Sequence, residues 1–408
     1  MRKYIYIPDS LILVLFLTIP FSAFGFYYQS FLISISLLPL IIINFICILN
    51  GIFNKKLIIY YLLFISICFF SSFVRHPIES FLPPLIILTF LLLPFTTALK
   101  LKNLQKYMIY SFAILSVYSL LELIIGSYSN EIMFNIENSL NLKGSTTTYR
   151  GIRRLRAGFL EPSVFGLALN FYLLVFIYIK SLNNRFKIFL ILLCIFWIIL
   201  TFSSAAYVAL MLNLIFFIYL KLRTIKFSFK LSLRSILSLF SLVLIIAFSV
   251  QNFFEPIYKA FEKILLIPEV IILGNITGSV GYRINSLIVA PIYIIEAQLF
   301  EKFFGTGFSN YSEYLISKFG NNEFSGFYDG QIGNILSAIL LSTGLLGFIS
   351  FILFIKRALY INNKIMNIHL LILSLITMIG FGDLTSIWIW SIFFLTVKTL
   401  KEINENSL

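Results

Sequence analysis

Long apolar runs separated by short polar segments dominate this chain. Most of the runs are long enough, or nearly so, to cross the hydrocarbon core of a bilayer, about 30 Å thick, as a helix. The runs are continuous and lack the two-residue alternation of membrane β-barrels. The pattern therefore predicts an all-α, polytopic integral membrane protein. We expect about twelve transmembrane helices, at residues 11–28, 31–49, 57–74, 81–99, 107–126, 159–179, 188–201, 205–220, 235–250, 332–355, 365–380 and 384–397.

Composition excludes a soluble globular protein. Apolar residues make up 60% of the chain and charged residues 12%, and the mean hydropathy is +0.97. Half-solvated helices need polar faces, which a chain of this composition cannot supply. The first run follows Arg2 and Lys3 and resembles a signal peptide, but the many later runs favour an uncleaved signal anchor. We treat residues 1–408 as a single membrane domain.

Cysteine and histidine give no sign of a metal site or a cofactor. The three cysteines lie inside apolar runs, where they act as small hydrophobic residues in helix packing. His76 and His369 are far apart in the sequence. We expect neither a disulfide framework nor a bound metal.

The loop charges set the expected orientation. When the runs are threaded alternately from a cytoplasmic N-terminus, most of the 31 lysine and arginine residues fall on the cytoplasmic side. Both termini are then cytoplasmic. The net charge of +14 is mainly a consequence of this topology, and we expect no binding to nucleic acid.

Two external segments are long. Residues 127–157 form an arginine-rich loop, and residues 252–331 form a large loop. A structureless loop of that size is unusual, so we expect short helices within it at 257–266 and 284–300. The second of these is amphipathic and predicted to lie along the outer membrane surface.

The arginine-rich loop contradicts the general charge pattern, because arginines are rare on the external side of membrane proteins. Its four arginines fall within one short segment just before the run at 159–179, and they are Arg150, Arg153, Arg154 and Arg156. Guanidinium groups match phosphate oxygens in pairs. We therefore expect a phosphate or pyrophosphate site. The alternative is that these arginines contact lipid phosphates or pair with external acids.

Three runs begin at the external side. One starts after Glu161 and Pro162, one near Ser203 and Ser204, and one after Gln331. Helix N-termini carry exposed N–H groups and the positive end of the helix dipole, so they are ready anion sites. Proline suits the first helical turn and serine suits an N-cap.

Several acidic and polar residues are further candidates. Glu161 is a candidate general base, or else the ion-pair partner of an arginine. Asp329 and Gln331 are candidates for binding sugar hydroxyls, although loop solvation explains them equally well. Glu122 is an acid within a span and needs a partner there.

Two glycine-containing motifs have simple structural interpretations. The motif at 303–308, Phe-Phe-Gly-Thr-Gly-Phe, is interpreted as a glycine-containing turn within a loop. The glycines of Ser-Thr-Gly-Leu-Leu-Gly at 342–347 are read as positions that permit close helix contact.

Taken together, three motifs resemble the bacterial O-antigen polymerase and ligase superfamily. They are the arginine-rich loop followed by Gly-Phe-Leu-Glu-Pro-Ser-Val-Phe-Gly at 158–166, Arg283 ahead of the turn at 304–308, and Asn334 ahead of 342–347. They occur in the family's order and cover the chain from about residue 150 to 350, whereas the first third matches only in topology.

The resemblance implies a Wzy-like glycosyltransferase that polymerises undecaprenyl-pyrophosphate-linked oligosaccharide repeat units into O-antigen, capsular or exopolysaccharide. The reaction would occur on the external face of the bacterial cytoplasmic (inner) membrane, without a cofactor. A chain-length regulator protein and membrane lipid are the implied partners. The catalytic candidates are Glu161 and Arg283, and the substrate-binding candidates are Arg150, Arg153, Arg154, Arg156, Ser203, Ser204, Asp329 and Gln331.

Two differences from the superfamily, and one other class of protein, bear on this interpretation. Ligases of the superfamily carry a histidine late in the large loop, and residues 252–331 contain none. Many members also have an arginine beside the serine at 203–204, where this chain continues with Ala205 and Ala206. Ligase-type transfer of glycan and a flippase or exporter of lipid-linked oligosaccharide remain the alternatives. Transporters usually place polar groups along several spans, whereas this chain keeps nearly all its charge outside them.

Overall fold

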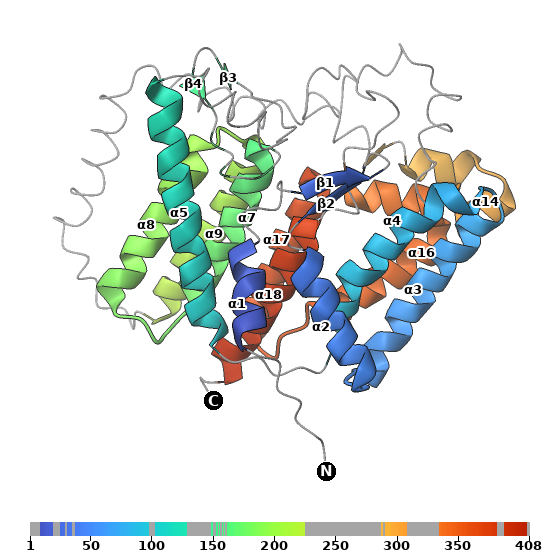
Figure 1. The fold of residues 1–408 in the computed structure, drawn as a ribbon, viewed down its shortest axis with the longest axis horizontal. Helices are drawn as coiled ribbons and strands as arrows, with labels where there is room; N and C mark the ends of the chain where they lie inside the picture. Colours follow the sequence, from blue (N-terminus) through green and yellow to red (C-terminus); the bar gives the residue numbers. More distant parts are fainter. Residues whose placement is uncertain are drawn as a thin grey trace.

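A computed structural model describes the helical body of the protein (Figure 1). The described residues are 9–18, 25–28, 31–34, 37–97, 103–128, 148–149, 152–153, 155, 157, 159, 161–224, 287–288, 290–307, 334–381 and 387–405.

Helices form nearly all of this described part. The α-helices are α1 (Asp9–Thr18), α2 (Leu37–Leu49), α3 (Lys55–Phe73), α4 (Ile78–Leu92), α5 (Leu104–Tyr128), α7 (Pro162–Tyr178), α8 (Asn184–Leu200), α9 (Ser204–Thr224), α14 (Leu299–Phe304), α16 (Ile335–Ala358), α17 (Lys364–Gly380) and α18 (Ile387–Glu405). A 3₁₀ helix, η2 (Leu93–Thr96), extends α4. The strands are β1 (Gly25–Tyr28), β2 (Phe31–Ser34), β3 (Thr148–Tyr149) and β4 (Ile152–Arg153).

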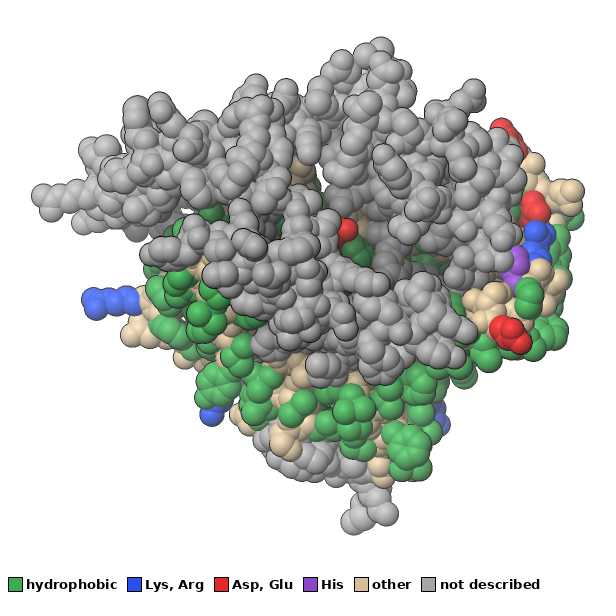
Figure 2. All heavy atoms as spheres, turned by 45° about the horizontal axis from the view of Figure 1, so that its top comes forward, with side chains coloured by type: hydrophobic (Ala, Val, Ile, Leu, Met, Phe, Trp, Pro, Cys, Tyr) green, Lys and Arg blue, Asp and Glu red, His purple; other side chains and the backbone are tan. Residues whose placement is uncertain are grey.

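Four helical segments of the described chain are long and apolar enough to cross a membrane: Lys55–Phe73, Ile78–Thr96, Leu104–Ile125 and Ile335–Ala358. Shorter apolar helices, of 10 to 17 residues, add to them at Leu37–Leu49, Pro162–Tyr178, Ser204–Leu220 and Lys364–Gly380. The predicted all-α class is confirmed, and the architecture is that of a multi-pass membrane protein. Figure 2 shows a described surface that is mostly hydrophobic, with acidic, basic and histidine side chains together at the right edge and further basic side chains at the left.

The first two predicted spans, at 11–28 and 31–49, were wrong as continuous helices. The chain instead forms α1, then the antiparallel ribbon β1–β2 with Gly25 opposite Ser34, and then α2. Pro20 in the sequence disfavours a helix at the residue before it. The aromatic residues that follow favour strand pairing.

The other predicted spans coincide with described helices, except that at 235–250, which lies outside the described residues, as does the predicted short helix at 257–266. Residues 287–288 and 290–296 are helical, within the predicted helix at 284–300. Its Ala290 and Tyr293 are buried against Ala338 and Leu341 of α16.

One end of the bundle, drawn lower in Figure 1, collects helix ends that adjoin basic loops. Gln105 at the start of α5 donates its main-chain N–H to Glu402 of α18, and Ser181 after α7 donates to the Gln105 side chain. The Lys398 ammonium group donates to the carbonyl of Thr97, just after η2. The opposite end carries the starts of α7, α9 and α16.

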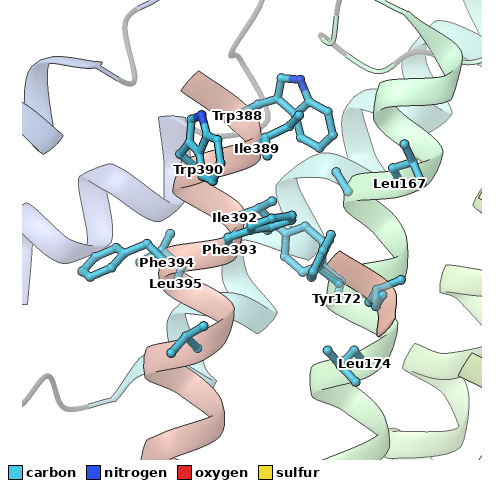
Figure 3. Close-up of a cluster of buried hydrophobic side chains, with 14 of the residues drawn as sticks. Leu167, Tyr172, Leu174, Trp388, Ile389, Trp390, Ile392, Phe393, Phe394 and Leu395 are labelled. Atoms are coloured by element: carbon cyan, nitrogen blue, oxygen red, sulfur yellow. The ribbon is translucent and has the colours of Figure 1, made fainter. Parts of the chain in front are cut away.

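The core is centred on α7 and α18. Every residue of α7 is buried, so this helix lies inside the bundle with neighbours all round. Figure 3 shows Phe393 of α18 directed toward α7, whereas Phe394 points to the other side of α18. The rings of Phe171 and Phe393 lie 4.9 Å apart, and that of Trp390 stands at 81° to Phe393. This packing fixes α7, and with it the position of Glu161 at its start.

Candidate functional site

Glu161 is the N-cap residue of α7, with extended backbone angles (φ −137°, ψ 150°), and Pro162 occupies the first turn as predicted. The Glu161 side chain does not cap the helix. It accepts a hydrogen bond of 2.9 Å from the hydroxyl of Ser163 and is exposed. The first N–H groups of α7 therefore receive no bond from the Glu161 carboxylate.

Ser203 caps α9. Its hydroxyl oxygen accepts a hydrogen bond of 3.4 Å from the main-chain N–H of Ala206, and Ser203 itself is buried. Ser204 begins the helix and is half-buried. The predicted serine cap is confirmed, and the capping residue is Ser203. Phe202, just before it, adopts a left-handed conformation (φ 46°), which is uncommon for a residue other than glycine.

A close helix contact brings the starts of α7 and α9 side by side. A Cβ atom on Gly166 would lie 2.5 Å from Cβ of Ala206 and 2.9 Å from the hydroxyl oxygen of Thr201. Only glycine allows this approach. Gly166 lies little more than one turn after Glu161, and Ala206 one turn after Ser203. Two helix N-termini, each with a partial positive charge, thus share one end of the bundle.

The start of α16 joins the same end through the residues that follow α17. The main-chain N–H of Ile335 donates to the carbonyl of Phe381 at 2.9 Å. Gly380, one residue earlier, packs closely against Ala205 of α9 and Leu167 of α7. The three helix starts that the sequence places outward are therefore linked by contacts in the folded protein.

Described residues within and just after the arginine-rich segment are anchored close to these starts. The N–H of Leu155 donates to the carbonyl of Leu200 at the end of α8 at 3.3 Å. Leu155, Ala157 and Phe159 are buried, and the ring of Phe159 packs against Trp388 of α18. The apolar members of the segment thus hold its backbone against the core.

Glu122 provides a second anchor for the same segment. One carboxylate oxygen of this buried α5 residue accepts a hydrogen bond of 2.7 Å from the N–H of Ala157. Ala157 is itself left-handed (φ 44°). Phe202, also left-handed, lies at this end of the bundle too, whereas left-handed Asn103 (φ 59°) lies at the opposite end, just before α5. The predicted need of Glu122 for a partner is met by a loop main chain.

The remaining predicted site residues divide into two groups. Arg153 lies in β4, where it pairs with Thr148 of β3. The others lie outside the described residues: Arg150, Arg154, Arg156, Arg283, Asp329 and Gln331.

Sequence reasoning missed a polar network in the interior below the site. Asn170 of α7 donates to the carbonyls of Gly166 and Ala206, and Asn213 of α9 donates to the Asn170 side chain at 2.8 Å. His369 of α17 bonds Asn213 through Nε2 at 2.8 Å and Tyr178 through Nδ1 at 3.3 Å. All but Tyr178 are fully buried. Asparagines within apolar runs were the available signal.

One bond of the network has a fixed direction. Because Asn213 donates its amide to Asn170, its oxygen is left to accept from Nε2–H of His369. The Tyr178 hydroxyl and Nδ1 of His369 share the other bond. The network ties α7, α9 and α17 together directly beneath the two helix starts.

Comparison with protein-family models gives no match to this chain, and comparison with curated protein sequences gives none either.

Proposed function

We propose that the protein is a glycosyltransferase that polymerises oligosaccharide repeat units carried on a lipid pyrophosphate, undecaprenyl pyrophosphate in the family that the sequence resembles. The observation that carries the proposal is that the starts of α7, α9 and α16 are linked by contacts, with Leu155, Ala157 and Phe159 of the arginine-rich segment buried against the neighbouring helices. Positive helix ends, together with the arginines that the sequence gives to this segment, suit a pyrophosphate, which carries the charge to be stabilised when it leaves.

The proposed reaction is a substitution at the anomeric carbon. A hydroxyl oxygen of one repeat unit forms the new bond to this carbon, and the bond from the carbon to the pyrophosphate oxygen breaks. The leaving lipid pyrophosphate takes the electron pair, and Arg154, Arg156 and Arg283 stabilise its charge. The hydroxyl proton passes to Glu161, whose exposed carboxylate stands at the start of α7.

The proposal includes a topology. We place both termini in the cytoplasm, the predicted spans other than those at 11–28 and 31–49 in the bacterial inner membrane, and the candidate site at the external face. The described helix ends that adjoin basic loops lie at one end of the bundle, which supports this orientation. Fusions of periplasm-active and cytoplasm-active reporters after Lys180 and after Tyr128 test it, with opposite outcomes expected at the two positions.

The function is tested by replacing the gene in its native cell with Arg154→Ala, Arg283→Ala and Glu161→Gln variants and separating the glycan by size. A polymerase defect leaves single repeat units on the final acceptor, a flippase defect leaves no glycan there, and a ligase defect leaves long chains on the lipid carrier. Arg185→Ala, exposed near the start of α8 at the opposite end, is the matched control and should give normal chains. Normal chain lengths in all three site variants would overturn the proposal.

A further inference from the structure

Two glycines far apart in the sequence meet in the same unusual backbone conformation. Gly305 follows α14 with φ 75° and ψ −168°, and Gly344 lies within α16 with φ 62° and ψ −165°. This region is accessible in practice only to glycine. A Cβ on Gly305 would lie 2.5 Å from the carbonyl of Leu341, and a Cβ on Gly344 would lie 2.5 Å from the main chain of Phe303.

At Gly344 the helix α16 is broken into two halves. A residue with these angles cannot continue the helical hydrogen-bond ladder across it. The carbonyls of Leu341 and Ser342, just before the break, accept hydrogen bonds from the turn after α14. Thr306 donates its N–H to Leu341 at 2.8 Å, and Gly307 donates its N–H to Ser342 at 3.0 Å.

The turn at 305–307 is held from a second side by the end of α3. Nε2 of His76 lies 2.8 Å from the carbonyl oxygen of Thr306. Arg75 forms an ion pair of 2.9 Å with Glu301 of α14, and its guanidinium carbon lies 5.5 Å from the Phe300 ring centre. We refer to residues 299–307 together with the break at 341–344 as the clasp.

An apolar span cannot leave carbonyl groups without donors. If the turn moves away, Leu341 and Ser342 can regain donors when α16 becomes continuous, because residues 345 and 346 then present their N–H groups. We propose that the clasp is a two-state element, in which an engaged turn keeps α16 broken and a released turn lets α16 become continuous.

A change of conformation at Gly344 would reach the candidate site through the first half of α16. Its start is bonded to Phe381, which follows the α17 residue packed on the start of α9. Straightening α16 at Gly344 would change the direction of residues 335–343 relative to α7 and α9. The clasp residues 299–307 belong to the predicted large loop at 252–331, so the clasp couples this loop to the arrangement of the helix starts.

A Gly344→Ala variant tests the proposal, since alanine both strains this conformation and meets the Phe303 main chain. Thr306→Cys reports release through a membrane-impermeant maleimide, because Thr306 is only 6% exposed and the native Cys47, Cys68 and Cys194 are buried. A spin-label pair at Leu340 and Leu353 reports the shape of α16. A continuous helix separates these backbone positions by about 20 Å.

In Gly344→Ala we expect labelling of Thr306→Cys to rise at least about fivefold and the spin-label distance to move to that of a continuous helix. Gly51→Ala is the matched control, because Gly51 has φ 61° with open space around it, and it should change neither signal. An Arg75→Ala, His76→Ala double variant loosens the turn without touching α16 and should shift both signals in the same direction. The proposal is overturned if the folded variants show no increase in maleimide labelling of Thr306→Cys. It is also overturned if labelling rises while the distance between the spin labels stays that of the broken helix.

Discussion

The carboxylate of Glu122 accepts a hydrogen bond from the main-chain N–H of Ala157 at 2.7 Å, and both residues are buried. This bond joins the C-terminal part of α5 to the arginine-rich segment. It gives a fixed backbone position to a stretch whose arginines are the basis of the proposed pyrophosphate site. A buried acid in an apolar helix is costly to retain, which is consistent with a role in positioning this segment.

Glu122→Leu should therefore loosen the segment. A hydrogen bond to a charged group contributes about 1.5–3 kcal/mol, and we expect a loss of that order in stability together with short glycan chains. The measurement is the thermal denaturation midpoint of the purified protein, followed by glycan sizing in cells. Glu122→Gln keeps an oxygen acceptor for Ala157 and should lie between the wild type and Glu122→Leu. Equal behaviour of Glu122→Leu and the wild type would show that the bond positions nothing.

Asn213→Leu should destabilise the bundle. It removes the side chain that links His369 to Asn170, and an unsatisfied buried polar group costs about 1–3 kcal/mol. Thermal denaturation in detergent or nanodiscs measures the loss. Met211→Leu on the same helix is exposed and should leave the midpoint unchanged. A stable Asn213→Leu protein would mean that the network contributes little to holding α7, α9 and α17.

Gly166→Ala should separate the starts of α7 and α9, because the added methyl group would lie 2.5 Å from Cβ of Ala206. Overpacking of this kind costs about 1–3 kcal/mol. We expect a lower denaturation midpoint and impaired chain extension. Gly380→Ala is the matched control, since its nearest neighbour, Cβ of Ala205, would be 3.3 Å away, so its effect should be smaller. The reverse order of the two variants would contradict the close-approach argument.

Glu402 lies at the opposite end and accepts a hydrogen bond from the N–H of Gln105 in the first turn of α5. A carboxylate there caps the helix from another element and complements its dipole. Glu402→Leu should lower stability by about 1 kcal/mol, as loss of a cap does. Glu402→Gln retains the oxygen acceptor and should recover about half of that loss. Denaturation midpoints of the two variants and the wild type, in the same detergent, measure these two losses of stability.

Local sequence signals were sufficient for the class of fold and for the helix starts. Long apolar runs predicted the helices, Pro162 predicted the start of α7, and the serine pair predicted the cap of α9. They failed at 25–34, where an apolar run contains strand-forming aromatic residues and folds as a ribbon. Hydropathy measures how apolar a run is, and it does not distinguish a helix from a short hairpin of the same composition.

The candidate site was predicted only in part. The sequence placed Glu161 and Ser203 at helix starts and Glu122 within a helix, but it did not predict the partner of Glu122 in the loop. It also marked the glycine motifs at 303–308 and 342–347 separately, as a turn within a loop and as helix contact. Their pairing joins residues of different elements, and neither motif carries a local signal for the other.

The sequence by itself determined that this chain is helical and apolar enough for a membrane, because hydrophobic length and capping residues act within each element. Tertiary structure alone decided which helix starts meet, that Gly166 lets α7 approach α9, and that the turn after α14 occupies a break in α16. These features depend on atoms brought together by packing between distant segments. No periodicity along one segment encodes them.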